Sequence, residues 1–583
     1  MKVRLVNENF TDDYVNNLLT ARGIQNVQDY FKPDETYLNS PSLLKNIRTA
    51  AALYLRTIQE GNILIIVDPD VDGFTSSAII YQYTRCLSDK CHIDWWLHEG
   101  KAHGLQEHIN KLMEENYEYD LIIIPDAGSN DCVYIDMLDE IHTPCLVLDH
   151  HLVDMKLSDN AIVVNNQTSP NYPNKELTGA GVVYQFCRYI DELTGNDYAK
   201  QFIDLAALGI IGDMGGMLDM ENRYFAYEGL KEENIKNSFF KALLEKQGYS
   251  ITGKSDASWS DIVKASNAIS VAFYIVPMIN AMIRVGTMPE KERLFLAFIA
   301  GDTQVPCGKR GAKGTYERVD IESARECANA KSKQNKILDN AIFSMDVKIV
   351  NYDLLDNKVL FCRLEEDDDF PSELNGLLAM KLSAKYKKPT IVARLCNDGE
   401  IKGSARGLNQ SELKDFKDFL LSSQYFTMAA GHANAFGCAI PDKDLRAFHQ
   451  YANKALEDID FGENVYDVNF SRKATSVDLS ALVTALGKAD GIWGQQNSQP
   501  LIYIENVELT RDNYRVMGAN KDTLKIEYKG MSYLKFHAKD LIAQIDDILI
   551  SGQGTLNIVG KPNINEWMGR VTPQIFIEDF EII

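Results

Sequence analysis

Acidic residues follow short apolar runs at several places in the first third of the chain. Carboxylates that meet in one place do not stay ionised together without cations. Carboxylates combined with one or two imidazoles suit Mn²⁺ or Mg²⁺. Two such ions about 3.5–4 Å apart can activate a water and stabilise the leaving oxygen of a phosphoester. The residues of interest follow the runs Ile63–Val67, Leu121–Ile124 and Cys145–Leu148, and they are Asp68, Asp70, Asp72, Asp126, Asp149, His150 and His151, with Asp213 after a fourth apolar stretch.

The apolar runs between residues 61 and 215 are short, rich in β-branched residues and separated by helical patterns, and a further run covers Ile162–Val164. This pattern predicts a parallel sheet with crossover helices. In an open parallel sheet the carboxyl ends of the strands meet at one edge, and ligands bind at that edge. Acids that are distant in sequence are therefore expected to converge.

The whole chain has 583 residues, which is too long for a single domain of ordinary size. A glycine- and lysine-rich segment at residues 308–314 indicates a hinge. We expect an α/β protein with two α/β lobes joined by a long helix, followed by a β-rich domain. The expected parts are a helical lead-in (1–60), a first α/β domain (61–305), a hinge and linker helix (306–345), a second α/β domain (346–460) and the β-rich domain (470–583).

The composition limits the classes of function. A net charge of −23 and a pI of about 4.9 argue against a general nucleic-acid coat protein, which would be basic, but not against an enzyme with a local basic groove. Lys309 and Arg310 place positive charge at the expected hinge, although a solvated loop would have the same composition. The ten cysteines include no Cys-x-x-Cys pair, so neither a disulfide framework nor a zinc site is indicated. With no apolar run approaching ~20 residues and no signal-peptide pattern, we expect a cytoplasmic protein without a membrane span.

These motifs resemble those of the DHH phosphoesterase superfamily. Asp68-x-Asp70-x-Asp72-Gly73, Asp126, Asp149-His150-His151 and Asp213 resemble its four motifs in order. Residues 402–406 and 431–435 resemble the Gly-Ser-Gly-Arg and Gly-Gly-His elements of its DHHA1 domain. Residues 277–284 and 559–583 are similar to segments of the RecJ-type single-strand DNA exonucleases, the second to the closing strands of their OB fold. The resemblance covers nearly the whole chain and implies a DHH domain, a DHHA1 domain and an OB-fold-like domain.

The resemblance also implies roles for individual residues. Five would ligate two divalent metal ions, Mn²⁺ or Mg²⁺: Asp70, Asp72, Asp126, His150 and Asp213. Asp68 would be a further ligand or a support for one. Asp149 would orient a histidine, and His151 would contact the scissile phosphate or assist proton transfer.

Other residues would bind the substrate. Ser404 and Arg406 would hold the DNA end, because arginine suits bidentate phosphate contacts, and His432 would approach the phosphate. Asn280 and Arg284 belong to the RecJ-like segment, in which Met278 and Ile283 depart from the Arg and Gly of the family. The segment around His98 departs from a family segment that carries a phosphate-contacting arginine, and we expect His98 or Lys101 as a substitute.

The function implied by the resemblance is hydrolysis of terminal phosphodiesters of single-stranded DNA, 5′ to 3′, to mononucleotides. A monomer is expected, and the acidic surface is compatible with a helicase or a single-strand binding protein as a partner. Two alternatives stay open. A small-substrate phosphodiesterase acting on oligonucleotides or cyclic dinucleotides would not need residues 470–583, and a non-catalytic DNA-binding scaffold would usually have lost metal ligands.

Overall fold

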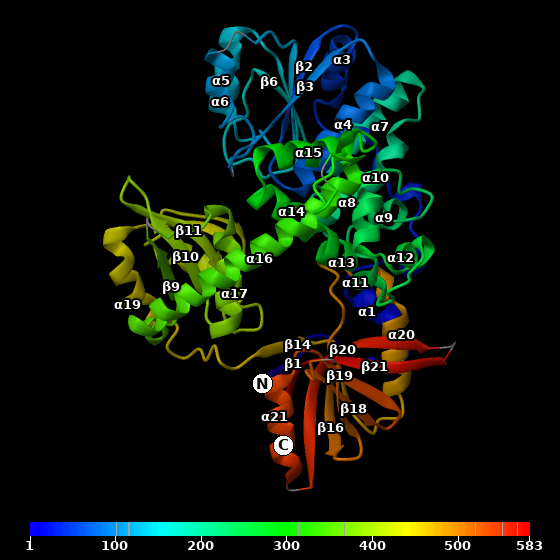
Figure 1. The fold of residues 1–583 in the computed structure, drawn as a ribbon, viewed down its shortest axis with the longest axis vertical. Helices are drawn as coiled ribbons and strands as arrows, with labels where there is room; N and C mark the ends of the chain where they lie inside the picture. Colours follow the sequence, from blue (N-terminus) through cyan, green and yellow to red (C-terminus); the bar gives the residue numbers. More distant parts are fainter. Residues whose placement is uncertain are drawn as a thin grey trace. The chain divides into compact units, whose positions relative to one another are not determined.

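The computed structural model describes residues 1–100, 102–114, 117–312, 314–365, 368–518, 520–550, 552–567 and 570–583. The chain divides into two compact units (Figure 1). The first unit comprises residues 22–334 and 491–498, and the second comprises residues 1–21, 335–490 and 499–583. Each unit is therefore assembled from separate stretches of the chain.

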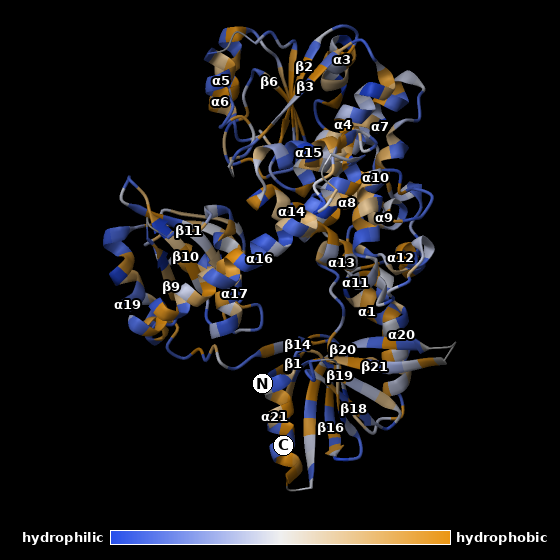
Figure 2. Cartoon of the chain, viewed as in Figure 1, coloured by the Kyte–Doolittle hydropathy of each residue, from blue (hydrophilic) through white to orange (hydrophobic). Residues whose placement is uncertain are grey.

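A five-stranded parallel sheet forms the centre of the first unit, in the order β3-β2-β4-β5-β6. Four of its strands coincide with the apolar runs of the sequence, which confirms the predicted sheet: β2 (Asn62–Val67), β4 (Leu121–Pro125), β5 (Cys145–Asp149) and β6 (Ala161–Asn165). These strands are buried on both faces, and Figure 2 shows them as hydrophobic. The strand not predicted from the sequence is β3 (His92–Leu97), which is at the edge and carries polar residues on its exposed positions.

Three helices pack together in the core of this unit: α4 (Val71–Leu87), α7 (Gly179–Thr194) and α8 (Ile203–Gly212). Each is largely buried, which explains why their sequences are apolar on several faces rather than on one stripe. A further helical stretch, Ala268–Val285, consists of α13 (Ala268–Ser270), a π-helical turn (Val271–Ile275) and α14 (Val276–Val285).

The stretch Ala268–Val285 corrects one expectation. Its 18 residues have a mean hydropathy of 1.7, so this stretch is long and apolar enough to cross a membrane by length and composition alone. However, 56% of this window is buried inside the structure, and α14 packs against α4, α8 and α15 (Met288–Ile299). Its apolar residues are explained by this packing.

The helix α16 (Val319–Asn351) is 33 residues long and provides the long linker helix expected from the sequence. After it, a five-stranded sheet lies in the second unit in the order β12-β13-β11-β10-β9. Its strands are β9 (Leu360–Leu364), β10 (Thr390–Leu395), β11 (Glu400–Arg406), β12 (Met428–His432) and β13 (Ala435–Pro441). Helix α17 (Asn375–Tyr386) packs on β10 and β11.

A seven-stranded sheet forms the β-rich end of the second unit, in the order β15-β16-β20-β21-β19-β18-β17. Its strands are β15 (Phe470–Lys473), β16 (Ile502–Thr510), β17 (Tyr514–Met517), β18 (Thr523–Tyr528), β19 (Met531–Lys535), β20 (Gln553–Trp567) and β21 (Arg570–Ile582). The β-rich region predicted from residue 470 onward is therefore present.

The beginning of the chain differs from the predicted helical lead-in. Residues Lys2–Leu5 form β1, which pairs in parallel with β14 (Val465–Val468). The first helix, α1, begins only at Tyr14. The reason is tertiary, because a four-residue strand forms only where a partner strand is available, and this partner is more than 450 residues away.

Candidate metal centre and substrate-binding residues

The carboxyl edge of the parallel sheet holds the predicted acids. Asp68 follows β2, Asp126 follows β4 and Asp149 ends β5. Each of the three is only 1% exposed, as is Asp72 in the first turn of α4. Asp126 has a φ of 68°, in the left-handed region that non-glycine residues seldom adopt. Such strain is typical of functional positions, where the surrounding structure holds the residue in place.

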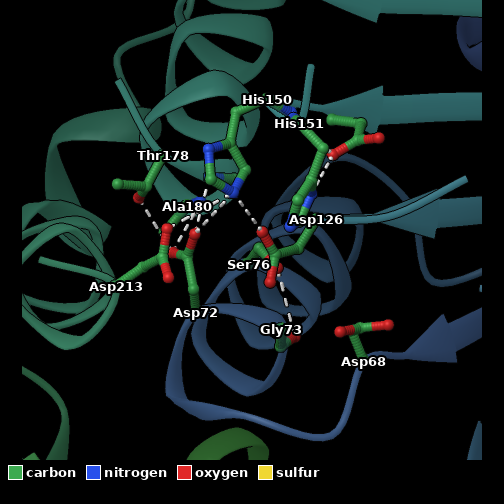
Figure 3. Close-up of polar contacts among 12 residues, drawn as sticks. Asp68, Asp72, Gly73, Ser76, Asp126, His150, His151, Thr178, Ala180 and Asp213 are labelled. Carbon is green, nitrogen blue, oxygen red and sulfur yellow. Dashed lines mark hydrogen bonds and ion pairs between the residues drawn. The ribbon is translucent and has the colours of Figure 1, made fainter. Parts of the chain in front are cut away.

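The imidazole of His150 lies among the carboxylates of Asp72, Asp126 and Asp213 (Figure 3). Its Nε2 is 3.2 Å from Asp126 Oδ1, 3.5 Å from Asp213 Oδ2 and 3.9 Å from Asp72 Oδ2. Although the first distance is short, its geometry is not that of a hydrogen bond, and both His150 Nε2 and Asp126 Oδ1 are buried without a hydrogen-bond partner among the described residues. Two orphaned buried atoms that face one another in this way fit a site for a cation.

The start of α7 holds Asp72 in place. Its carboxylate accepts hydrogen bonds from the Thr178 hydroxyl (3.0 Å) and from the backbone N–H groups of Gly179 (2.6 Å) and Ala180 (3.0 Å). The amino end of a helix favours a negative charge of this kind. A side chain at Gly179 would clash with Asp126, and one at Gly209 would clash with Asp72, so these glycines permit the close approach.

The acids and His150 fall into two adjacent groups. In one, ligand atoms of Asp72, His150 and Asp213 lie within 4.8 Å of one another, and in the other those of Asp68, Asp70 and Asp126 do. The contact between His150 and Asp126 joins the two groups. Oxygen ligands with one nitrogen suit Mg²⁺ or Mn²⁺ rather than a metal that prefers thiolates. The donor set therefore fits the divalent cations expected from the sequence.

The raised pKa values of these acids also fit a cation site. Burial, followed by the neighbouring carboxylates, raises the pKa of Asp126 well above its ordinary value. The same two causes raise the pKa of Asp213 to about 8. Burial raises the pKa of Asp68 to about 6, with its contact to His103 acting in the opposite direction. Carboxyl groups packed in this way repel one another when ionised, and a cation would remove that repulsion.

Asp149 and His151 form a second polar arrangement beside the first. Asp149 accepts hydrogen bonds from the backbone N–H groups of Ser129 (2.9 Å), His150 (2.7 Å) and His151 (3.1 Å), and its Oδ1 lies 2.8 Å from His151 Nδ1. Although burial opposes it, the bond to His151 lowers the pKa of Asp149. The same bond, again against burial, raises the pKa of His151 to about 10. Half of the His151 side chain is exposed, so its other nitrogen can reach a substrate.

The loop after β3 changes the expectation for His98. Its side chain is buried, its Nδ1 is 3.2 Å from Glu107, and its ring packs on His108 with 4.5 Å between the ring centroids. These contacts bury the imidazole, which argues against the expected phosphate contact. Lys101, the other expected substitute, lies outside the described residues. His103, which sequence reasoning missed, lies 2.6 Å from Asp68 through Nδ1, and its side chain is 62% exposed. The sequence signal that could have indicated His103 is a histidine in the loop after β3, the strand next to β2.

Asn280 and Arg284 both lie on α14, at accessible positions of an otherwise buried helix. Burial lowers the pKa of Arg284, and the negative charge of Asp70 acts in the opposite direction, which places the guanidinium near the acidic cluster. Lys309 and Arg310 are exposed in the hinge segment, and Lys309 Nζ is 3.0 Å from Glu317.

The second unit brings Ser404, Arg406 and His432 together on one face of its five-stranded sheet. Arg406 and His432 are both paired with Ala435, and Ser404 is paired with Gly437 two positions along. Directly paired residues of antiparallel strands point to the same side, as do residues two apart on one strand. Gly437 leaves open space between its neighbours, and Arg406 lies against Gly376 at the start of α17. Three partly or fully accessible polar groups thus surround a patch of the sheet that bears no side chain at Gly437.

The chain was compared with known proteins. Residues 62–210 match the family model described as the DHH family, N-terminal domain, and residues 468–579 match the RecJ OB domain. The chain is 36% identical over 595 residues to a Bacillus subtilis (strain 168) protein with the provisional name SPbeta prophage-derived single-strand DNA-specific exonuclease YorK, covering 100% of this chain and 98% of that protein. It is 25% identical to the single-stranded-DNA-specific exonuclease RecJ of the same organism, covering 97% and 67%. The crystal structure of Thermus thermophilus RecJ in complex with Mn²⁺ matches with a TM-score of 0.72 at 19% identity, over 100% of this chain and 79% of that one.

Proposed function

Because the chain belongs to the RecJ-type single-strand DNA-specific exonucleases of the DHH superfamily, we propose that it hydrolyses terminal phosphodiesters of single-stranded DNA, 5′ to 3′, and releases mononucleotides. One observation carries the proposal. Six potential ligands meet at one sheet edge, and two buried atoms among them, His150 Nε2 and Asp126 Oδ1, face each other without a hydrogen-bond partner among the described residues. A scaffold that had lost catalysis would have no reason to keep this unfavourable arrangement.

The two groups of ligands support a centre for two ions, one at Asp72, His150 and Asp213 and the other at Asp68, Asp70 and Asp126. Mn²⁺ or Mg²⁺ bound there supplies Lewis acidity for the phosphoester and lowers the pKa of water toward neutrality. The protein holds the ligands in fixed positions. The start of α7 fixes Asp72, and the backbone around Asp149 fixes the loop that carries His150 and His151.

His151 has the geometry to hold a proton next to the scissile bond. Its Nδ1 is bound to Asp149, and its half-exposed ring leaves Nε2 for the phosphate or the leaving group. We assign to His103, in place of His98, the second imidazole contact with the substrate, because its exposed ring is anchored on Asp68.

Recognition of the DNA end is assigned to Ser404, Arg406 and His432, together with Asn280 and Arg284. The exposed face of β11–β13 offers a guanidinium, a hydroxyl and an imidazole around the open patch at Gly437. Arginine binds a terminal phosphate through two parallel hydrogen bonds. The match of residues 468–579 to the RecJ OB domain supports a contribution of this region to binding longer strands.

The remaining expectations belong to the same proposal. They are the domain limits given above, a contribution of Lys309 and Arg310 to strand binding, action as a monomer, and a helicase or single-strand binding protein that supplies or presents the strand.

The test is digestion of single-stranded DNA labelled separately at each end, with Mn²⁺, using wild type and Asp126→Ala. The proposal expects immediate release of the 5′ label as a mononucleotide by wild type and none by the variant. Cleavage of dinucleotides without degradation of the strand would support the small-substrate alternative instead. Absence of both activities would leave the DNA-binding scaffold.

A further inference from the structure

Two large aromatic side chains are exposed on the π-helical turn Val271–Ile275. Phe273 is 74% exposed and Tyr274 is 37% exposed, and their rings meet edge to face with 6.2 Å between centroids. Large exposed apolar groups often mark a binding surface. A π-helical turn within an α-helix is rare and is frequently found at functional sites. The assigned site residues include neither Phe273 nor Tyr274.

The helix that follows this turn borders the metal centre at two points. A side chain at Gly212, the residue before Asp213, would lie 3.9 Å from Val276. Two turns further along, Arg284 lies near enough to Asp70 to interact with its charge. The π-helical turn itself packs against α8, the helix that ends at Gly212. Phe273 and Tyr274 thus precede by two or three residues Val276, the residue that lies beside Gly212.

The accessible positions of this helix form one stripe. Pro277, Asn280 and Arg284 are partly accessible, and their spacing of i, i+3 and i+7 places these three on one face of α14. Phe273 lies four residues before Pro277, in the π-helical turn that leads into this helix. The residues between them are buried: Val276, Met278, Ile279, Ala281, Met282 and Ile283. A continuous accessible strip therefore leads from the acidic cluster at Asp70 to the aromatic pair.

We propose that Phe273 and Tyr274 form a base-stacking platform for a base of the single strand that lies beyond the two nucleotides flanking the scissile bond. The inference rests on the proposed function and names the part of the substrate that this surface takes. Aromatic faces stack on any base, so they suit an enzyme that acts without sequence preference. Two whole aromatic side chains bury about 300–500 Å², and the partly exposed rings of Phe273 and Tyr274 offer less, which is well below the roughly 800 Å² per partner of a stable protein interface. A nucleobase is therefore the occupant that fits.

The experiment compares a 12-nucleotide single strand with a dinucleotide, both with Mn²⁺. Phe273→Ala is expected to raise KM for the 12-nucleotide strand about tenfold, the lower range for loss of one stacked base, and to leave dinucleotide hydrolysis unchanged. Phe273→Trp should behave as wild type, whereas Phe273→Leu should behave as Phe273→Ala, because stacking needs a ring and not only an apolar group. Tyr249→Ala is the matched control, since Tyr249 is 69% exposed on α11 (Gly248–Thr252), which packs on α10 (Ser238–Lys246) and α12 (Trp259–Ala265).

Binding separates this inference from the proposed function. The affinity for the same strand is measured by fluorescence anisotropy in an Asp126→Asn background, with and without Phe273→Ala. A tenfold loss of affinity supports the platform even if wild type turns out not to degrade DNA. Equal affinity, or an equal loss of activity on the dinucleotide, overturns it. Circular dichroism checks that the variants are folded, which exposed positions allow.

Discussion

The sheet edge that holds Asp126 and the open face of β11–β13 assemble polar groups in opposite ways. At the edge, residues from several strand ends and helix starts are buried, bound to backbone N–H groups and, at Asp126, held in a strained conformation. On the face, Ser404, Arg406 and His432 are brought together by strand register alone and are partly or fully accessible. Under the proposed function, bonds are broken at the edge, where charge is buried unfavourably, and the accessible face only has to hold the substrate.

The largest effect is expected at the edge. Asp126→Asn should lower kcat about 10³-fold, the upper range for loss of one electrostatic stabiliser. In chelator, the same variant should be more stable than wild type at neutral pH, because it removes a carboxyl group whose ionisation is disfavoured in the folded protein by burial and by neighbouring acids, as its strongly raised pKa indicates. Thermal unfolding with and without Mn²⁺ checks this, and Mn²⁺ should stabilise wild type more than the variant. A variant that is less stable in chelator would contradict the repulsion described here.

A smaller effect is expected at Asp149, which supports His151 without being among the grouped ligands. Asp149→Asn should lower activity about 10–100-fold and the free energy of unfolding by about 3 kcal/mol. Because the pKa of Asp149 is lowered in the folded protein, its contribution is complete above the ordinary pKa near ~4 and is lost as the pH falls below it. The unfolding curves of the two proteins should therefore converge in acid. A constant difference at all pH values would exclude this cause.

The open face should respond in KM rather than in kcat. Arg406→Ala is expected to raise KM for 5′-phosphorylated single strands about tenfold, equal to ~1.4 kcal/mol for a charged hydrogen bond. Lys402→Ala is the matched control, since Lys402 lies on the same strand and face and is paired with Asp398. Steady-state kinetics of both variants gives the change in KM and the change in kcat separately. An equal change of KM in the two variants, or a change confined to kcat, would contradict a role of Arg406 in binding the DNA end.

The smallest effect is expected for substitutions of His98 and His103, the two histidines of the loop after β3. His103→Ala should lower kcat/KM about fivefold, equal to ~1 kcal/mol, because it removes one contact with Asp68. His98→Ala should instead lower the melting temperature and leave kcat/KM of the folded protein unchanged, because His98 is buried against His108 and Glu107. The opposite result, in which His98→Ala lowers kcat/KM and His103→Ala does not, would support the phosphate contact that the sequence led us to expect for His98.

The sequence sufficed for features that repeat a simple physical pattern. Buried parallel strands give continuous apolar runs, so β2, β4, β5 and β6 and the acids that follow them could be predicted. The edge strand β3 has polar residues on its open side and gives no such run. The contact between His103 and Asp68 joins two loops, and loops have no period from which a contact could be inferred.

Pairing of β1 with β14 has a consequence for biosynthesis. The two strands are separated by about 460 residues, which at roughly 5–20 residues per second takes between about 25 and 90 seconds to translate. During that time β1 has no partner strand, although residues 22–334, the larger part of the first unit, are already synthesised. A tag or deletion at residues 2–5 should therefore affect completion of the second unit, and ribosome-bound chains that end before Val465 should expose β1 to proteases.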